Sequence, residues 1–125
     1  MNATYWLTLT IIMTAVLWLP YILHSILHRG LMETMGYDDN LPPLSDWAVR
    51  AKRAHYNGIE NLVLFAPVVI LAPSKDGDVA TAAMAYFIAR ALHYVVYVAK
   101  IPVLRTLTFF GGWAATLYIA YTIIG

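Results

Sequence analysis

An apolar stretch near the start of the chain decides the class of this protein: residues 5–23 read YWLTLTIIMTAVLWLPYIL, without one formal charge. A helix needs about 20 mainly apolar residues to cross the hydrocarbon core of a bilayer. Three further stretches meet the same test, so the sequence predicts an all-α integral membrane protein, a bundle of four transmembrane helices. We expect these helices at about residues 3–28, 46–72, 79–100 and 104–124, within a single domain over residues 1–125.

The composition of the 125 residues agrees with a membrane protein and argues against other classes. Apolar residues make up 61% and charged residues 12% of the chain, against about 45–50% and about 25% in soluble domains. A net charge of +1 supplies no field that would gather nucleic acid, so no nucleic-acid partner is expected. The chain has no cysteine, and its four histidines lack a carboxylate at metal-ligand spacing, so no metal site is expected.

Prolines and polar residues predict where the helices bend and where they begin. Pro20 and Pro67 lie inside predicted spans and predict kinks, because a proline removes one helical hydrogen bond and clashes with the preceding turn. Residues 30–44 are rich in Gly, Asp, Asn and Pro and predict a polar loop. Ser45 or Asp46 is the expected cap of the second helix.

Basic residues predict the orientation of the bundle, because cytoplasmic flanks carry an excess of Lys and Arg. Among the lysines and arginines, only Lys75 lies on the side that holds the connection between the second and third helices. Both termini, which share that side, are therefore expected outside the cytoplasm. The opposite side holds Arg29, Arg50, Lys52, Arg53, Lys100 and Arg105.

Polar residues gather on one face of the second predicted helix. At 100° per residue, an arc of roughly 100° contains Arg50, Arg53, Asn57, Glu60 and Asn61, whereas Lys52 and His55 lie away from it. Glu60 lies two turns deeper than Arg53, directly before an apolar run, where an ionised carboxylate is costly and indicates a functional site. Anchoring at the lipid head groups, or an Arg53–Glu60 pair within the helix, is the structural alternative.

A second polar stripe follows the third predicted helix, where Tyr86, Arg90, His93 and Tyr97 recur at helical spacing and Tyr94 borders them. For Tyr86 and His93 taken individually, ordinary interfacial packing is the favoured explanation. A guanidinium at mid-span needs a partner, and Glu60 is the candidate partner for Arg90. Arg105, just beyond Pro102, is placed to reach a ligand held by the second and third helices.

These residues carry a family resemblance. Residues 50–67, RAKRAHYNGIENLVLFAP, resemble the second-helix signature of the MAPEG proteins, the membrane-associated proteins of eicosanoid and glutathione metabolism, through Arg53, Asn57 and Glu60. Residues 90–106, RALHYVVYVAKIPVLRT, are similar to the microsomal glutathione transferase branch. The resemblance covers nearly the whole chain and implies a homotrimer in a bacterial inner membrane, with glutathione bound as co-substrate between neighbouring subunits.

The resemblance also implies roles for individual residues. Arg53 and Asn57 would bind carboxylate and backbone groups of glutathione, and Glu60 its α-amino group. Arg105 would stabilise the glutathione thiolate, with Tyr97 as the alternative, since Asn61 stands where leukotriene C synthase has a tyrosine and the Tyr97–Arg105 spacing varies among branches. The remaining candidate glutathione-binding residues are Arg29, Arg50, Arg90, His93 and Tyr94.

The expected function is that of a membrane-bound glutathione transferase or peroxidase. A cation beside the thiol favours the thiolate, the actual nucleophile, which would add to lipophilic electrophiles or reduce lipid hydroperoxides. The expected partners are further copies of the chain, membrane lipid and a small lipophilic substrate. Two other hypotheses remain: a lipid-binding or scaffold protein without turnover, like the lipoxygenase-activating protein of the same family, and a channel or proton relay through Glu60, Arg90 and His93.

Overall fold

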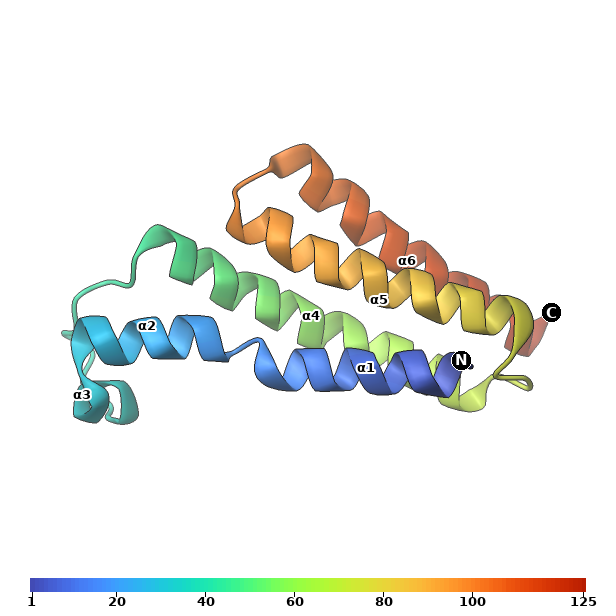
Figure 1. Cartoon of the computed structure of the whole chain (residues 1–125), viewed down its shortest axis with the longest axis horizontal. Helices are drawn as coiled ribbons and strands as arrows, with labels where there is room; N and C mark the ends of the chain where they lie inside the picture. Colours follow the sequence, from blue (N-terminus) through green and yellow to red (C-terminus); the bar gives the residue numbers. More distant parts are fainter.

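The computed structural model describes all 125 residues as an all-helical chain without strands. Four segments are long and apolar enough to cross a membrane, as an integral membrane protein requires. The first of them, Ala3–Arg29, consists of two helices, and a short helix follows it (Figure 1). In chain order the helices are α1 (Ala3–Val16), α2 (Leu19–Arg29), α3 (Leu31–Met35), α4 (Asp46–Leu71), α5 (Gly77–Val98) and α6 (Pro102–Ile124).

The kink predicted at Pro20 is present as a break between α1 and α2 at Leu17 and Trp18. Pro20 has no N–H to donate to the carbonyl of Val16, four residues earlier, and Val16 is the last residue of α1. The helix therefore ends one turn before the proline and restarts with Pro20 in the first turn of α2, where a missing N–H costs nothing.

Side chains from other helices bond two carbonyl groups at this break. The carbonyl of Thr14 accepts a hydrogen bond from His55 Nε2 at 2.8 Å, and that of Leu17 accepts one from the Tyr94 hydroxyl at 3.4 Å. Since His55 donates through Nε2, its Nδ1 accepts from the Tyr21 hydroxyl at 2.8 Å. The break is thus braced by α4 and α5, and buried backbone groups find side-chain partners where the helix stops.

Other expectations about the connections need correction. Residues 31–35 form α3 instead of loop, and Thr34 ties this helix to α2 through a 2.9 Å hydrogen bond to the Ser25 hydroxyl. α4 continues through Pro67 as one helix, unlike the chain at Pro20, and a bend within α4 stays a prediction. Ser45 precedes α4, but its side chain makes no capping bond; its backbone N–H donates to His24 Nε2 at 3.1 Å. α5 and α6 each begin two residues before their predicted starts at 79 and 104.

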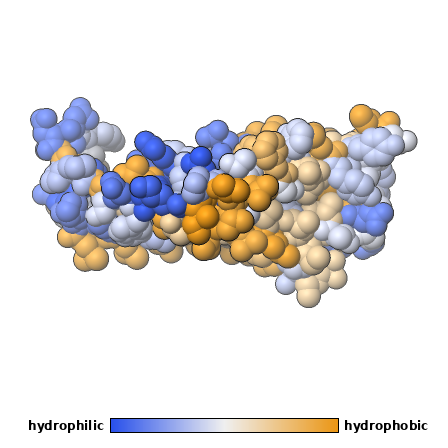
Figure 2. Space-filling model, turned by 90° about the horizontal axis from the view of Figure 1, so that it is seen from above, coloured by the Kyte–Doolittle hydropathy of each residue, from blue (hydrophilic) through white to orange (hydrophobic).

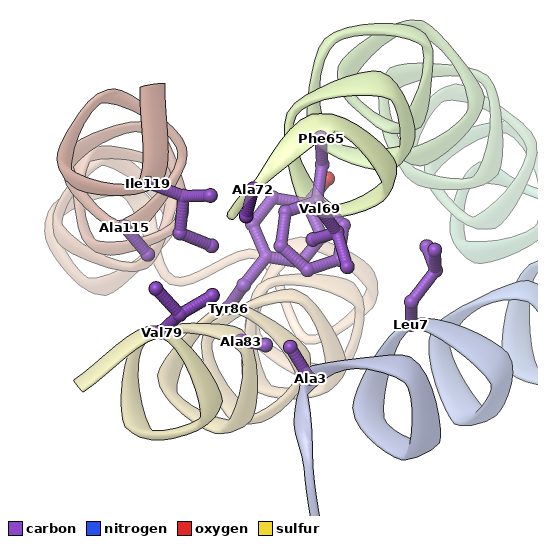
Figure 3. Close-up of a cluster of buried hydrophobic side chains, with 10 residues drawn as sticks. All are labelled: Ala3, Leu7, Phe65, Val69, Ala72, Val79, Ala83, Tyr86, Ala115 and Ile119. Atoms are coloured by element: carbon purple, nitrogen blue, oxygen red, sulfur yellow. The ribbon is translucent and has the colours of Figure 1, made fainter. Parts of the chain in front are cut away.

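Close packing is concentrated in the half of the bundle near the termini. Phe65 and Tyr86 stack there with ring centroids 3.7 Å apart, and small residues let the helices approach (Figure 3). The buried cluster of this half consists of Ala3, Leu7, Phe65, Val69, Ala72, Val79, Ala83, Tyr86, Ala115 and Ile119. The other half has a smaller cluster, formed by Tyr21, Ala48 and Ala51.

The two ends of the bundle differ in charge. Both termini lie at one end, and α3 and the α5–α6 connection lie towards the other (Figure 1). Hydrophilic residues gather at the α2–α3 end and hydrophobic residues over the middle of the face shown in Figure 2. We call the end with α3 and the α5–α6 connection the basic end, because its residues include Arg29, Arg50, Lys52, Arg53, Lys100 and Arg105.

Candidate functional site

A hollow of about 370 Å³ lies among α4, α5 and α6 near the basic end. Asn57 comes from the middle of α4, His93 and Tyr97 from the last turns of α5, and Arg105 from the first turn of α6. Thr106, Phe109 and Phe110 of α6 complete the lining. We call this the aromatic hollow; it combines one cation, one amide and four aromatic or imidazole rings.

Tyr97 and Arg105 form a wall of this hollow. The guanidinium carbon of Arg105 lies 5.0 Å from the centroid of the Tyr97 ring, within the range of a cation–π interaction. His93 is buried and lies beside Tyr97, with the ring centroids 5.5 Å apart. The exposed guanidinium is therefore held over an aromatic face and remains available to an anionic ligand.

The same two residues line a second hollow of about 200 Å³, at the connection between α5 and α6. We call it the elbow hollow. Arg50 reaches it from α4, and its Nε donates a 3.0 Å hydrogen bond to the carbonyl of Val98, the last residue of α5. Its other lining residues are Lys100, Ile101 and Pro102.

A third hollow, of about 400 Å³, lies where α2 meets α4, and we call it the α2 hollow. Arg29, the last residue of α2, is fixed there by a 2.7 Å hydrogen bond from its Nε to the carbonyl of Pro42. Arg53 of α4 lines the same hollow and is exposed. The other lining residues are Pro43, Leu44, Val49, Lys52 and Tyr56.

Arg90 does not pair with Glu60, so that prediction is wrong. Arg90 is only 4% exposed, and its Nη2 donates a 2.7 Å hydrogen bond to the side-chain oxygen of Asn57. Its Nε and Nη1 are buried without a partner. Glu60 is exposed, and its side chain makes no hydrogen bond within the chain.

Comparison with known proteins decides the family. The sequence profile described as the MAPEG family matches residues 3–125. This chain belongs to the MAPEG family. No solved structure matches the chain.

Curated relatives of this MAPEG chain are microsomal glutathione S-transferases. The protein named microsomal glutathione S-transferase 1 from Mus musculus is 37% identical over 79 residues, which are 60% of this chain and 51% of the relative. The Bos taurus and Homo sapiens proteins of the same name are 34% and 32% identical over 83 residues, 63% of this chain and 54% of each relative. The chain spans about half the length of the curated relatives it matches.

The structure divides the candidate residues of this MAPEG chain into groups. Arg53 and Glu60 lie on the outward side of α4, and Arg53 shares the α2 hollow with Arg29. Arg90 and Tyr94 lie apart, at a small internal cavity of about 10 Å³ beside the α1–α2 break. The aromatic and elbow hollows bring together Arg50, Asn57, His93, Tyr97 and Arg105.

Two residues of interest were not singled out from the sequence as site residues. Lys100 lines the elbow hollow, and Phe109 lines the aromatic hollow. Nothing in the sequence distinguishes Phe109 from the other apolar residues of the fourth predicted helix as a site residue. Lys100 had a signal: a lysine two residues before Pro102 falls at a helix end, where a side chain projects into the space between the two helices.

Proposed function

We propose that this MAPEG protein is a membrane-bound glutathione transferase or peroxidase, acting as a single domain. The family membership and the glutathione S-transferase relatives support this function. The observation that carries it is the Arg105–Tyr97 pair on the wall of the aromatic hollow. A guanidinium beside a thiol in a water-poor site favours the thiolate.

The chemistry follows from a thiolate held beside Arg105. In conjugation the thiolate sulfur forms a bond to an electrophilic carbon, and the leaving group departs with the bonding pair or an epoxide oxygen takes it and a proton. In peroxide reduction the thiolate attacks the terminal oxygen, the O–O bond breaks, and the alkoxide takes a proton to become an alcohol. The glutathione sulfenic acid then reacts with a second glutathione to give the disulfide and water.

The candidate residues fit the charges of glutathione. Two carboxylates need cations, which Arg29 and Arg53 supply in the α2 hollow. The α-amino group needs an acceptor of opposite charge, and Glu60 is exposed and unpaired on the same side of α4. Asn57 offers an amide NH₂ group to the peptide part, while its oxygen remains with Arg90.

We infer that the working unit is a homotrimer with α4 facing a neighbouring subunit. The α2 hollow and the aromatic hollow share no lining residue, so Arg29 and Arg105 of one chain are separated by α4. An exposed carboxylate such as Glu60 within a span is costly against lipid. A neighbouring copy over this face of α4 would shield Glu60 and bring the two groups of residues to one ligand.

The basic end would face the cytoplasm, where glutathione is available, and both termini the outside of a bacterial inner membrane. Lipophilic substrates would reach the aromatic hollow from the membrane. Glutathione from water and the lipophilic substrate from the membrane would then meet at Arg105. Holding both reactants in one site makes their reaction effectively intramolecular.

The test is glutathione-dependent turnover of chlorodinitrobenzene and of cumene hydroperoxide by the purified protein in liposomes. We expect both activities, and we expect Arg53→Ala and Glu60→Ala each to weaken glutathione binding by more than about tenfold in calorimetry. His55→Phe is the control on the same helix, because His55 lies away from the polar face of α4 and lines none of the three hollows; its effect should stay within about threefold.

Two results would overturn the proposal. Glutathione binding without turnover of either substrate would favour the lipid-binding or scaffold function. A mass measurement in mild detergent that finds only monomers would refute the homotrimer.

A further inference from the structure

The elbow hollow is a positively charged site. Of its residues, only Arg105 and Tyr97 also line the aromatic hollow, where we place the thiolate chemistry. Its basic residues are Arg50, Lys100 and Arg105, and no carboxylate lines it. Arg50 donates through Nε to Val98, and its two Nη groups make no hydrogen bond within the chain. Three cations without an acidic partner favour an anion, and a guanidinium with free Nη groups is suited to phosphate oxygens.

The backbone at Lys100 gives a second, independent indication. Lys100 is the only non-glycine residue of the chain in the left-handed region, with φ of 64°. Its N–H bonds the carbonyl of Tyr97 at 3.1 Å, and the N–H of Ile101 bonds that of Val96 at 2.9 Å. This pair of bonds is the Schellman ending of a helix, whose left-handed position glycine normally takes. A lysine in this strained position points to a role for its side chain.

The surroundings of the hollow indicate where the anion comes from. The hollow lies between the last residue of α5 and the first of α6, at the boundary of two membrane spans. Ile101 and Pro102 form its apolar lining, and the apolar surface continues outward along α6 with Val103, 69% exposed, and Leu107, 59% exposed. An anion with an attached hydrocarbon chain matches this combination.

We propose that the elbow hollow binds the phosphate head group of an anionic membrane lipid, held by Lys100 and Arg50, with an acyl chain along the exposed side of α6. Basic pockets between transmembrane helices at the membrane boundary suit such head groups. Glutathione is a poorer match, because the hollow offers no carboxylate or amide side chain to its α-amino group and Glu60 does not line it.

The test measures lipid binding directly and needs no turnover, so its result is independent of the glutathione chemistry. The protein is placed in nanodiscs of phosphatidylcholine with increasing phosphatidylglycerol, and retained lipid is quantified by native mass spectrometry. We expect Lys100→Gly and Lys100→Asn to weaken phosphatidylglycerol binding about tenfold, as loss of one charge-assisted contact does. Lys100→Arg should keep most of the affinity.

The variants separate binding from folding. Glycine and asparagine both suit the left-handed backbone, so Lys100→Gly and Lys100→Asn should unfold no earlier than the unchanged protein. Lys52→Gln removes the same charge at the same end of the bundle, outside the elbow hollow, and should change lipid binding by less than about twofold. Equal losses at Lys52 and Lys100 would show attraction to the surface charge alone and overturn the site.

Two further outcomes would assign the hollow to another ligand. If soluble glycerol phosphate displaces phosphatidylglycerol at the lipid's own affinity, the hollow binds free anions and the acyl chain contributes nothing. If Lys100→Gly weakens glutathione binding and leaves phosphatidylglycerol binding unchanged, the hollow belongs to the glutathione site.

Discussion

The hydrogen bonds of His55 offer a direct test of how the α1–α2 break is held. The change His55→Phe keeps a ring of similar size but removes both bonds, leaving the Thr14 carbonyl and the Tyr21 hydroxyl buried without His55. Each unpaired buried group costs about 1–3 kcal/mol in soluble proteins. Interhelical hydrogen bonds in membrane proteins average about 0.6 and reach about 1.7 kcal/mol. We therefore expect a loss of about 1–4 kcal/mol.

The assay is unfolding in mixed micelles by increasing dodecyl sulfate, followed by circular dichroism. A free energy of unfolding that changes by less than about 0.5 kcal/mol would show that the two bonds do not stabilise the fold. Glutathione affinity should stay within about threefold in the folded fraction, because His55 lines none of the three hollows.

A double-mutant cycle with Pro20→Ala tests whether His55 acts on the break itself. Alanine restores the missing N–H and permits a continuous helix, in which the Thr14 carbonyl regains a backbone donor. In that background His55→Phe should cost about half as much, a coupling that only neighbouring sites show. Strictly additive losses would refute the link between His55 and the break.

Three further predictions concern the site and its packing. Arg105→Leu should raise the pKa of the bound glutathione thiol, so that activity lost near neutral pH returns as pH rises; ultraviolet thiolate absorbance against pH checks this, and an upward shift in Tyr97→Phe alone would reverse the two roles. In isolated subunits, Arg53→Ala should leave thermal stability within about 0.5 kcal/mol, because its side chain is exposed; a larger loss would indicate a structural role. Gly112→Ala should cost about 1–3 kcal/mol, since its new Cβ would lie 3.2 Å from the buried side chain of Arg90, whereas Gly111→Ala meets only an ordinary 3.5 Å contact and should be nearly neutral; equal unfolding midpoints would contradict this.

The membrane spans and the break at Pro20 could be predicted because they depend on local properties. Apolar length sets a span, and the N–H that Pro20 lacks weakens the turn before it, although α4 continues through Pro67 and shows that a proline does not always end a helix. The short helix α3 was missed because its five residues are too few for a periodic pattern, and it is fixed by Thr34 and Ser25, which come together only in the folded chain.

The partner of Arg90 could not be predicted from either helix alone. Helical spacing shows which residues share a face, but the rotation of α4 against α5 decides whether Asn57 or Glu60 meets the guanidinium. His55 shows the same limit: its distance from the polar arc was correctly assigned, yet its contact with Thr14 depends on the break in α1 lying opposite it. The roles of Arg29, Arg53, Glu60 and Arg105 stay predictions until binding is measured.

The unequal packing of the two halves has a consequence for how ligands enter and leave. The half near the termini is fastened by the Phe65–Tyr86 stack and its cluster of ten residues, whereas the basic half has a cluster of three. The helices are therefore held together tightly at the end near the termini, and local separation of the helices costs less at the basic end. Amide hydrogen exchange should accordingly be fastest in the last turn of α5 and the first turn of α6, and slowest around Phe65. All three hollows have residues in this loosely packed half, so we expect ligands to enter and leave there, while the packed half near the termini keeps the fold intact.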